Sequence, residues 1–148
     1  MIAFETSVRI ERPIEDVFAF VSDPLQLPLW NSAVQTVQIS SGEMGEPGSK
    51  YSMVRDLPTG RVENELEVFV REYPRALGIR TTSGPTPFVY RYRFDSEGDA
   101  TVLGLDAEVE LPAAAVVLGP LAARGIKRGV EANFAALRQS LEETVARV

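Results

Sequence analysis

The chain has 148 residues and a net charge of −6, with 45% apolar and 24% charged residues. A chain of this length is typical of one folded domain, which buries roughly 68–70% of the surface of the unfolded chain. The excess of acidic side chains argues against a nucleic-acid partner, because such surfaces neutralise phosphates with basic side chains. We therefore expect a single domain over residues 1–148.

The sequence contains neither histidine nor cysteine. Their absence excludes Ser-His and Cys-His nucleophiles, zinc sites of the usual His/Cys type, and disulfides. No stretch approaches the ~20 apolar residues of a membrane span, and the first residues do not resemble a secretion signal. We expect a cytoplasmic protein without a metal or cofactor, in which any proton transfer falls to Asp, Glu, Tyr, Lys or an ordered water.

The first 30 residues predict a strand followed by two short helices. Residues 2–10 alternate between apolar and polar side chains, which indicates a strand. Pro13 suits the first turn of a helix, and the residues after it recur at helical spacing as Ile14, Val17, Phe18 and Val21. Asp23 before Pro24 has the pattern of an N-cap with a first-turn proline, so a second helix is predicted through about Leu29.

Six further strands are predicted at residues 34–39, 51–55, 61–71, 77–81, 88–94 and 103–109. Turn-forming segments rich in Gly, Pro, Ser and Asp separate them, which is typical of an antiparallel meander. Within residues 61–71 one face carries Val62, Asn64, Leu66, Val68 and Val70. The opposite face carries Glu63, Glu65 and Glu67, which we interpret as a solvated outer surface rather than a metal site.

The last segment, from Pro112 onward, has helical spacing. Its apolar stripe consists of Ile126, Val130, Phe134, Leu137 and Leu141. Gly119 and Pro120 are expected to kink or interrupt the beginning of this helix.

This order resembles the START-like helix-grip (SRPBCC) superfamily, and most closely its bacterial polyketide cyclase/dehydrase branch. The resemblance spans essentially the whole chain and is carried by residues 10–18, 22–24, Trp30, 90–94 and 137–142. It implies an α+β helix-grip fold. In that fold a seven-stranded curved antiparallel sheet wraps around a long C-terminal helix, and two short helices lie between strands 1 and 2.

The resemblance also implies a function. Members of the superfamily include carriers of lipids and sterols, binders of plant hormones, and aromatic-ring cyclases, so fold alone does not choose among them. We expect a cavity between the sheet and the C-terminal helix that binds a small hydrophobic molecule such as a lipid, polyketide or aromatic metabolite. A polyketide cyclase or dehydratase that uses Tyr, Arg or Asn hydrogen bonds is the alternative. The third interpretation is an interaction module without a ligand.

Four polar side chains are the main candidates for contacts with such a ligand. Tyr51 and Tyr90 fall on inward strand faces, where a phenol can hydrogen-bond over an apolar wall. Asn64 is an amide on an apolar face and needs a partner, either a ligand, a water or a neighbouring side chain. Arg55 shares a face with Met53, so it either pairs with an anionic ligand group or is solvated.

The resemblance places Trp30 near the mouth of the cavity. The full set of expected ligand-binding residues is Trp30, Tyr51, Met53, Arg55, Asn64, Leu66, Thr81, Phe88, Tyr90, Tyr92, Leu105, Ile126 and Val130. We expect the ligand to enter near residues 83–88 and 112–121, since loops and small residues in both segments permit movement.

Overall fold

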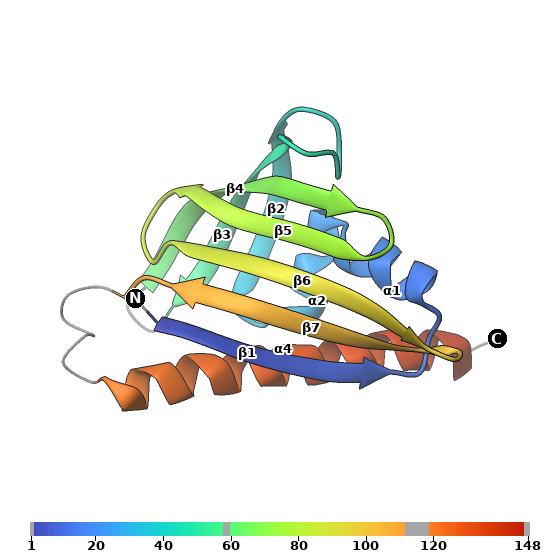
Figure 1. The fold of residues 1–148 in the computed structure, drawn as a ribbon. Helices are drawn as coiled ribbons and strands as arrows, with labels where there is room; N and C mark the ends of the chain where they lie inside the picture. The colour runs from blue at the N-terminus through green and yellow to red at the C-terminus, as the bar shows by residue number, and fades with distance from the viewer. Residues whose placement is uncertain (1, 58–59, 112–118, 147–148) are drawn as a thin grey trace.

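The structure, a computed structural model, describes the chain except for residues 1, 58–59, 112–118 and 147–148. The strands and helices follow one another in the predicted order (Figure 1). They are β1 (Ile2–Ile10), α1 (Ile14–Val21), a 3₁₀ turn (Pro24–Gln26), α2 (Leu27–Trp30), β2 (Val34–Ser41), β3 (Lys50–Leu57), β4 (Gly60–Glu72), β5 (Ala76–Ser83), β6 (Phe88–Glu97), β7 (Ala100–Val109) and α4 (Pro120–Ala146).

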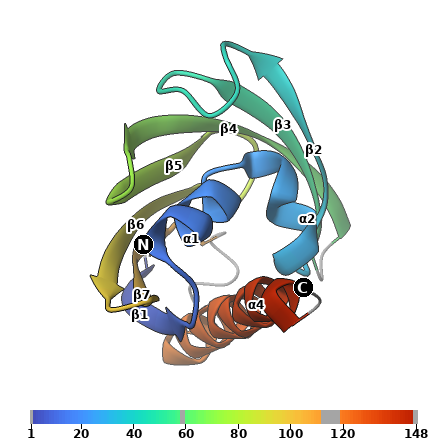
Figure 2. The same cartoon turned by 90° about the vertical axis from the view of Figure 1, so that its right-hand side faces the viewer.

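All seven strands form one antiparallel sheet in the order β1-β7-β6-β5-β4-β3-β2. The strands from β2 to β7 are joined as successive hairpins, and β1 pairs with β7 from Ile2 opposite Val109 to Ile10 opposite Thr101. The sheet curves into an arc that encloses α1 and α2, and α4 closes its open side (Figure 2). The predicted helix-grip fold is therefore confirmed.

The two short helices begin and end where small, local signals place them. The apolar stripe of α1 is buried, and the backbone N–H of Leu25 donates to the Asp23 carboxylate at 3.0 Å. Two details differ from the prediction. Pro13 precedes α1 in an extended conformation instead of lying in its first turn, and the chain after Asp23 forms a 3₁₀ turn before α2.

Strand β4 departs from strict alternation in its second half. Its pairing with β5 shifts register between Val68 and Val70, so Val68 is buried while Val70 is partly exposed. The predicted common face for these two valines is therefore wrong at Val70, because a bulge adds one residue and breaks the period of two. On the outer face, the Phe69 ring lies over Gly78, where a Cβ atom would come within 2.8 Å of the ring.

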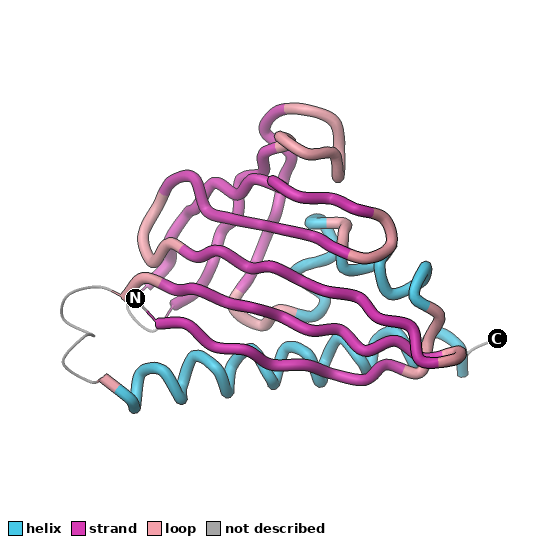
Figure 3. Tube along the Cα trace, in the orientation of Figure 1, coloured by secondary structure: helices cyan, strands magenta, loops and turns pink. Residues whose placement is uncertain are grey.

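Helix α4 begins at Pro120, directly after Gly119, whose φ of 46° lies in the left-handed region. The predicted helical period between residues 112 and 118 lies outside the described residues. From Val130 onward the predicted stripe is buried, and the helix packs against β1 and α2. Helices lie on one side of the sheet only, as the tube in Figure 3 shows. No described helix is long and apolar enough to cross a membrane.

Candidate functional site

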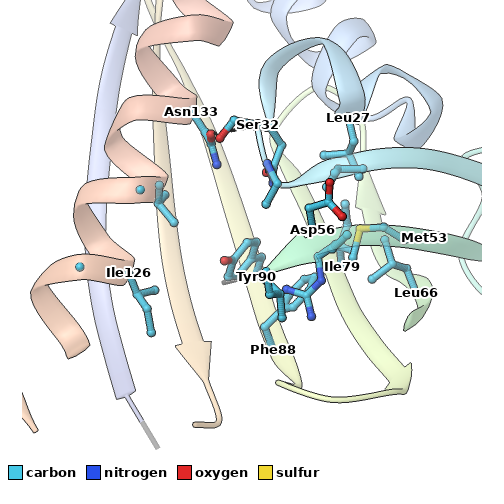
Figure 4. Close-up of a pocket in the computed structure, with 18 of the residues that line it drawn as sticks. Leu27, Ser32, Met53, Asp56, Leu66, Ile79, Phe88, Tyr90, Ile126 and Asn133 are labelled. Atoms are coloured by element: carbon cyan, nitrogen blue, oxygen red, sulfur yellow. Dashed lines mark hydrogen bonds between the residues drawn. The ribbon is translucent and has the colours of Figure 1, made fainter. Parts of the chain in front are cut away.

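A cavity of about 540 Å³ lies between the concave face of the sheet, the α2–β2 connection and the first half of α4. This volume is within the range of roughly 300–1,000 Å³ found for small-molecule sites. In Figure 4, Ile126 and Asn133 of α4 lie on one side and Met53, Leu66 and Ile79 of the sheet on the other. The expected site residues that line the cavity are Met53, Arg55, Leu66, Phe88, Tyr90, Tyr92, Ile126 and Val130.

The sheet side of the cavity is largely apolar because neighbouring strands place inward residues side by side. Ile79 of β5 pairs with Tyr90 of β6, and Met53 and Leu66 come from the neighbouring strands β3 and β4. Along β6 the rings of Phe88 and Tyr90 lie 4.4 Å apart between centroids. These residues form an apolar wall on which an apolar ligand can lie.

Arg55 is the one arginine among the residues that line the described cavity. Its Nη2 donates to Asn64 Oδ1 at 2.7 Å, Thr86 Oγ1 at 2.6 Å and the Pro85 carbonyl at 3.1 Å. No carboxylate of the described residues forms an ion pair with it. Burial lowers the pKa of the Arg55 guanidinium from its ordinary value, and Tyr90 partly opposes this effect. The cavity wall therefore carries a positive charge without a counterion.

The tyrosines of β6 add neutral polar groups beside this charge. Burial raises the pKa of Tyr90, with Arg55 acting in the opposite direction, and burial also raises the pKa of Tyr92. Both phenols therefore remain protonated at neutral pH and serve as hydrogen-bond donors rather than as bases. Neither hydroxyl is hydrogen-bonded to another described residue.

Asn64 lies behind Arg55 and does not line the cavity. Its side chain is 1% exposed. The amide oxygen accepts from Arg55, and Nδ2 donates to the carbonyls of Ser83 at 3.2 Å and Pro85 at 2.8 Å. The sequence left open whether Asn64 binds a ligand, a water or a neighbouring side chain. In the structure its partners are a neighbouring side chain and loop carbonyls, and these hydrogen bonds connect the β5–β6 connection to β4.

Four other expected residues are also placed outside the cavity lining. The Tyr51 hydroxyl accepts from the Gly45 backbone N–H at 2.7 Å, and the Thr81 hydroxyl accepts from Phe88 N–H at 3.0 Å. Trp30 and Leu105 are buried in the core. Tyr51 and Leu105 are buried as inward strand residues, but the loop after β2 and the core cover them. Trp30, expected near the mouth of the cavity, lies in the core, and Thr81 is partly buried beside a separate small pocket.

The cavity also contains residues that the sequence did not single out. They come mainly from the α2–β2 connection and from α4, and are Leu27, Asn31, Ser32, Ala33, Val34, Asp56, Leu57, Ile79, Gly125, Gly129 and Asn133. The sequence did contain a sign that the α4 residues share a face. Gly125, Gly129 and Asn133 follow one another at intervals of four beside the Ile126 stripe. The connection residues gave no comparable periodic signal.

A family model for polyketide cyclases and dehydrases and for lipid transport matches residues 1–142. The fold and the cavity indicate a START-like protein. The family match shows that the chain belongs to the polyketide cyclase/dehydrase and lipid transport family. A comparison with curated proteins found no match.

Solved structures share the fold over nearly their whole length. A START superfamily protein from Mycobacterium smegmatis is 19% identical, with a TM-score of 0.81 over 97% of this chain and 99% of that chain. TTHA0849 from Thermus thermophilus is 17% identical, with a TM-score of 0.82 over 96% and 98%. The Zhui aromatase/cyclase from Streptomyces sp. R1128 is 17% identical, with a TM-score of 0.72 over 97% and 94%. At these identities the similarity concerns the fold alone.

Proposed function

We propose that this protein binds one small hydrophobic molecule, such as a lipid, polyketide or aromatic metabolite, in the cavity between the sheet and α4. The observation that carries this proposal is the cavity of about 540 Å³, whose wall is mainly apolar but includes the unpaired charge of Arg55. An apolar ligand displaces water from the wall, which contributes about 25 cal/mol per Å² of buried apolar surface. The cavity weighs against an interaction module without a ligand.

Arg55 defines where the polar end of the ligand lies. A guanidinium that contacts only neutral acceptors gains more from a carboxylate or an enolate oxygen than from a further carbonyl, because charge-assisted hydrogen bonds are stronger. We expect this end of the ligand to lie beside Arg55 and Tyr90, over the Phe88 ring, whose centroid is 5.8 Å from the guanidinium carbon.

Titration with the neutral fluorescent probe N-phenyl-1-naphthylamine tests the proposal, together with native mass spectrometry of freshly purified protein. We expect saturable binding of one probe per chain. Gly129→Leu should weaken it, because Gly129 is an exposed residue at the border of the cavity, where an added Cβ meets no atom within 4 Å and a leucine has room to cover the opening. Ala132→Leu, on the exposed side of α4, is the matched control and should bind like the wild type. Absence of saturable binding to the wild type would contradict the proposal.

A cyclase or dehydratase is the second candidate, favoured by the family match and by the donors in the cavity. Arg55 and the protonated Tyr90 are groups of the kind that stabilise negative charge on a carbonyl oxygen as a carbon–carbon bond forms. Mass spectrometry separates the candidates, since a binder releases its ligand unchanged and a dehydrating cyclase releases a product that has lost water. Tyr90→Phe should then slow product formation more than it weakens binding.

A further inference from the structure

Asn133 is a polar residue on the part of α4 that faces the cavity. It follows Ile126 and Val130 at helical spacing, and all three line the cavity. Its neighbour Phe134 is buried in the core. An amide among these apolar side chains is partly buried, so it needs hydrogen-bond partners that the surrounding side chains do not supply.

One hydrogen bond fixes the orientation of this amide. The backbone N–H of Ser32, in the α2–β2 connection, donates to Asn133 Oδ1 at 3.3 Å. Because an N–H group requires an oxygen as its acceptor, the NH₂ group of Asn133 must be on the other side. Figure 4 shows the oxygen of Asn133 directed toward Ser32 and its nitrogen toward the interior of the cavity. No described residue accepts a hydrogen bond from this nitrogen.

The cavity therefore has hydrogen-bond donors at two separate places. Arg55 lies over the ring of Phe88, which is next to the Tyr90 ring. Asn133 is instead at the end beside Ser32 (Figure 4). Asp56 is the acidic residue among the described lining residues, and its carboxylate is exposed and accepts from Gln35. Arg55, Tyr90 and the NH₂ group of Asn133 therefore offer donors to a ligand, beside the Asn31 amide and the Ser32 hydroxyl, which can donate or accept.

We propose that Asn133 is a second polar anchor, and that the ligand carries hydrogen-bond acceptors at two separated positions on an apolar body. One acceptor faces Arg55 and Tyr90, and the other is a carbonyl or hydroxyl oxygen that faces the NH₂ group of Asn133. This inference rests on the proposed function and specifies the chemical class of the ligand. Gly129 and Gly125 lie one and two turns before Asn133, so the ligand can approach the backbone of α4 on its way to the amide.

Dodecanoate and its monoketo derivatives, with the ketone moved along the chain, test this inference by displacement of bound N-phenyl-1-naphthylamine. In the wild type we expect one ketone position to bind roughly three- to tenfold more tightly than dodecanoate, the effect of one added hydrogen bond. Asn133→Asp retains an oxygen for the Ser32 N–H but replaces the donor with an acceptor. In this variant the ratio between the best ketone and dodecanoate should fall to about one.

Two further variants complete the experiment. Gln139→Glu makes the same change of amide to acid on an exposed part of α4, and its ketone profile should match that of the wild type. Asn133→Leu removes the donor without adding charge and should also flatten the profile. Three results would each contradict the role of Asn133 as a second anchor without contradicting the proposed function. They are a flat profile in the wild type, a peak retained in Asn133→Asp, and dodecanoates that fail to displace the probe. If the neutral probe itself does not bind, the proposed function also fails.

Discussion

Arg55 differs from the ion-paired arginines of this protein in what surrounds it. Arg12 pairs with Asp16 at 2.7 Å and Arg80 with Glu67 at 2.8 Å, and both acidic partners lie on the surface or near it. Arg55 instead contacts an amide, a hydroxyl and a carbonyl, none of which carries charge. A cation in partly buried surroundings without an acidic partner is a feature that a bound anion would stabilise.

The hydrogen bonds of Asn64 lead to a prediction about stability. Asn64→Leu leaves the Ser83 and Pro85 carbonyls and the Arg55 guanidinium without their amide partner. We expect the free energy of unfolding to fall by about 1–3 kcal/mol, measured by urea denaturation. Glu63→Leu, on the exposed face of the same strand, should change it by no more than about 0.5 kcal/mol. Stability near the wild-type value together with weaker ligand binding would instead make Asn64 a ligand contact.

The buried tyrosines predict a loss of stability at alkaline pH. Burial raises the pKa of Tyr92 in the folded protein, whereas the unfolded side chain ionises near its ordinary value of about 10. Above that pH the unfolded state binds fewer protons than the native state, so the free energy of unfolding decreases as pH rises. Tyr92→Phe should make this decrease less steep, measured by urea denaturation from neutral pH to about pH 11. Tyr73→Phe, at an exposed tyrosine, is the control. Equal slopes in the wild type and Tyr92→Phe would refute the prediction.

Helix α4 has two halves with different surroundings. Its second half contributes Phe134, Leu137 and Leu141 to the core. Its first half has two exposed glycines, Gly125 and Gly129, which border the cavity and where an added Cβ would meet no atom within 4 Å. Glycine in a helix interior reduces stability by roughly 0.5–1 kcal/mol relative to alanine. The first half of α4 is therefore less stable as a helix than it would be with alanines, and it leaves space next to its backbone.

Replacing these glycines with alanine should increase the stability of the protein. In the ligand-free protein, Gly125→Ala and Gly129→Ala should each raise the free energy of unfolding by about 0.5–1 kcal/mol, because an added Cβ meets no atom within 4 Å at either position. Urea denaturation measures the change. Gly78→Ala provides the contrast, since its Cβ would lie 2.8 Å from the Phe69 ring and should lower stability. Destabilisation by either α4 alanine would show that these glycines are needed for folding rather than for the cavity.

At the scale of the whole molecule, the cavity is bordered by the α2–β2 connection, by the end of β3 and by the first half of α4. Arg55 stabilises the β5–β6 connection, because it donates to Thr86 as well as to the Pro85 carbonyl. Thr86 has a φ of 52°, a left-handed conformation that is rare for a β-branched residue. A ligand anion can bind Nη1 of Arg55, which donates to no described residue, so that these loop contacts stay in place and the bound ligand covers them.

Hydrogen exchange with and without ligand tests the predicted entrance. We expect exchange to slow on binding at residues 83–88 and at the beginning of α4, while residues 130–141 remain protected in both states. Phe88 lines the cavity, Arg55 of the cavity wall binds Pro85 and Thr86, and the first half of α4 borders the cavity from Gly125 onward. The earlier part of the predicted entrance, residues 112–118, lies outside the described residues. Equal protection of both halves of α4, with and without ligand, would mean that the ligand enters elsewhere.

Patterns that extend over a few residues were sufficient to predict the elements of this protein. The α1 stripe, the Asp23 cap and the alternation in β6 depend on local spacing, and each appears in the structure where the sequence placed it. The same patterns indicated which strand faces point inward. The bulge in β4 was not predicted, because it depends on how two strands pair and not on the alternation within one of them.

Only the tertiary structure decided which inward residues border the cavity. Met53 lines it, whereas Tyr51, two residues earlier on the same face, binds the loop after β2. Asn133 and Ser32 are 101 positions apart in the sequence and meet only when α4 closes the arc of the sheet. A cavity is space that distant elements leave unfilled, so the spacing within any one element determines the direction of a side chain but not what lies opposite it.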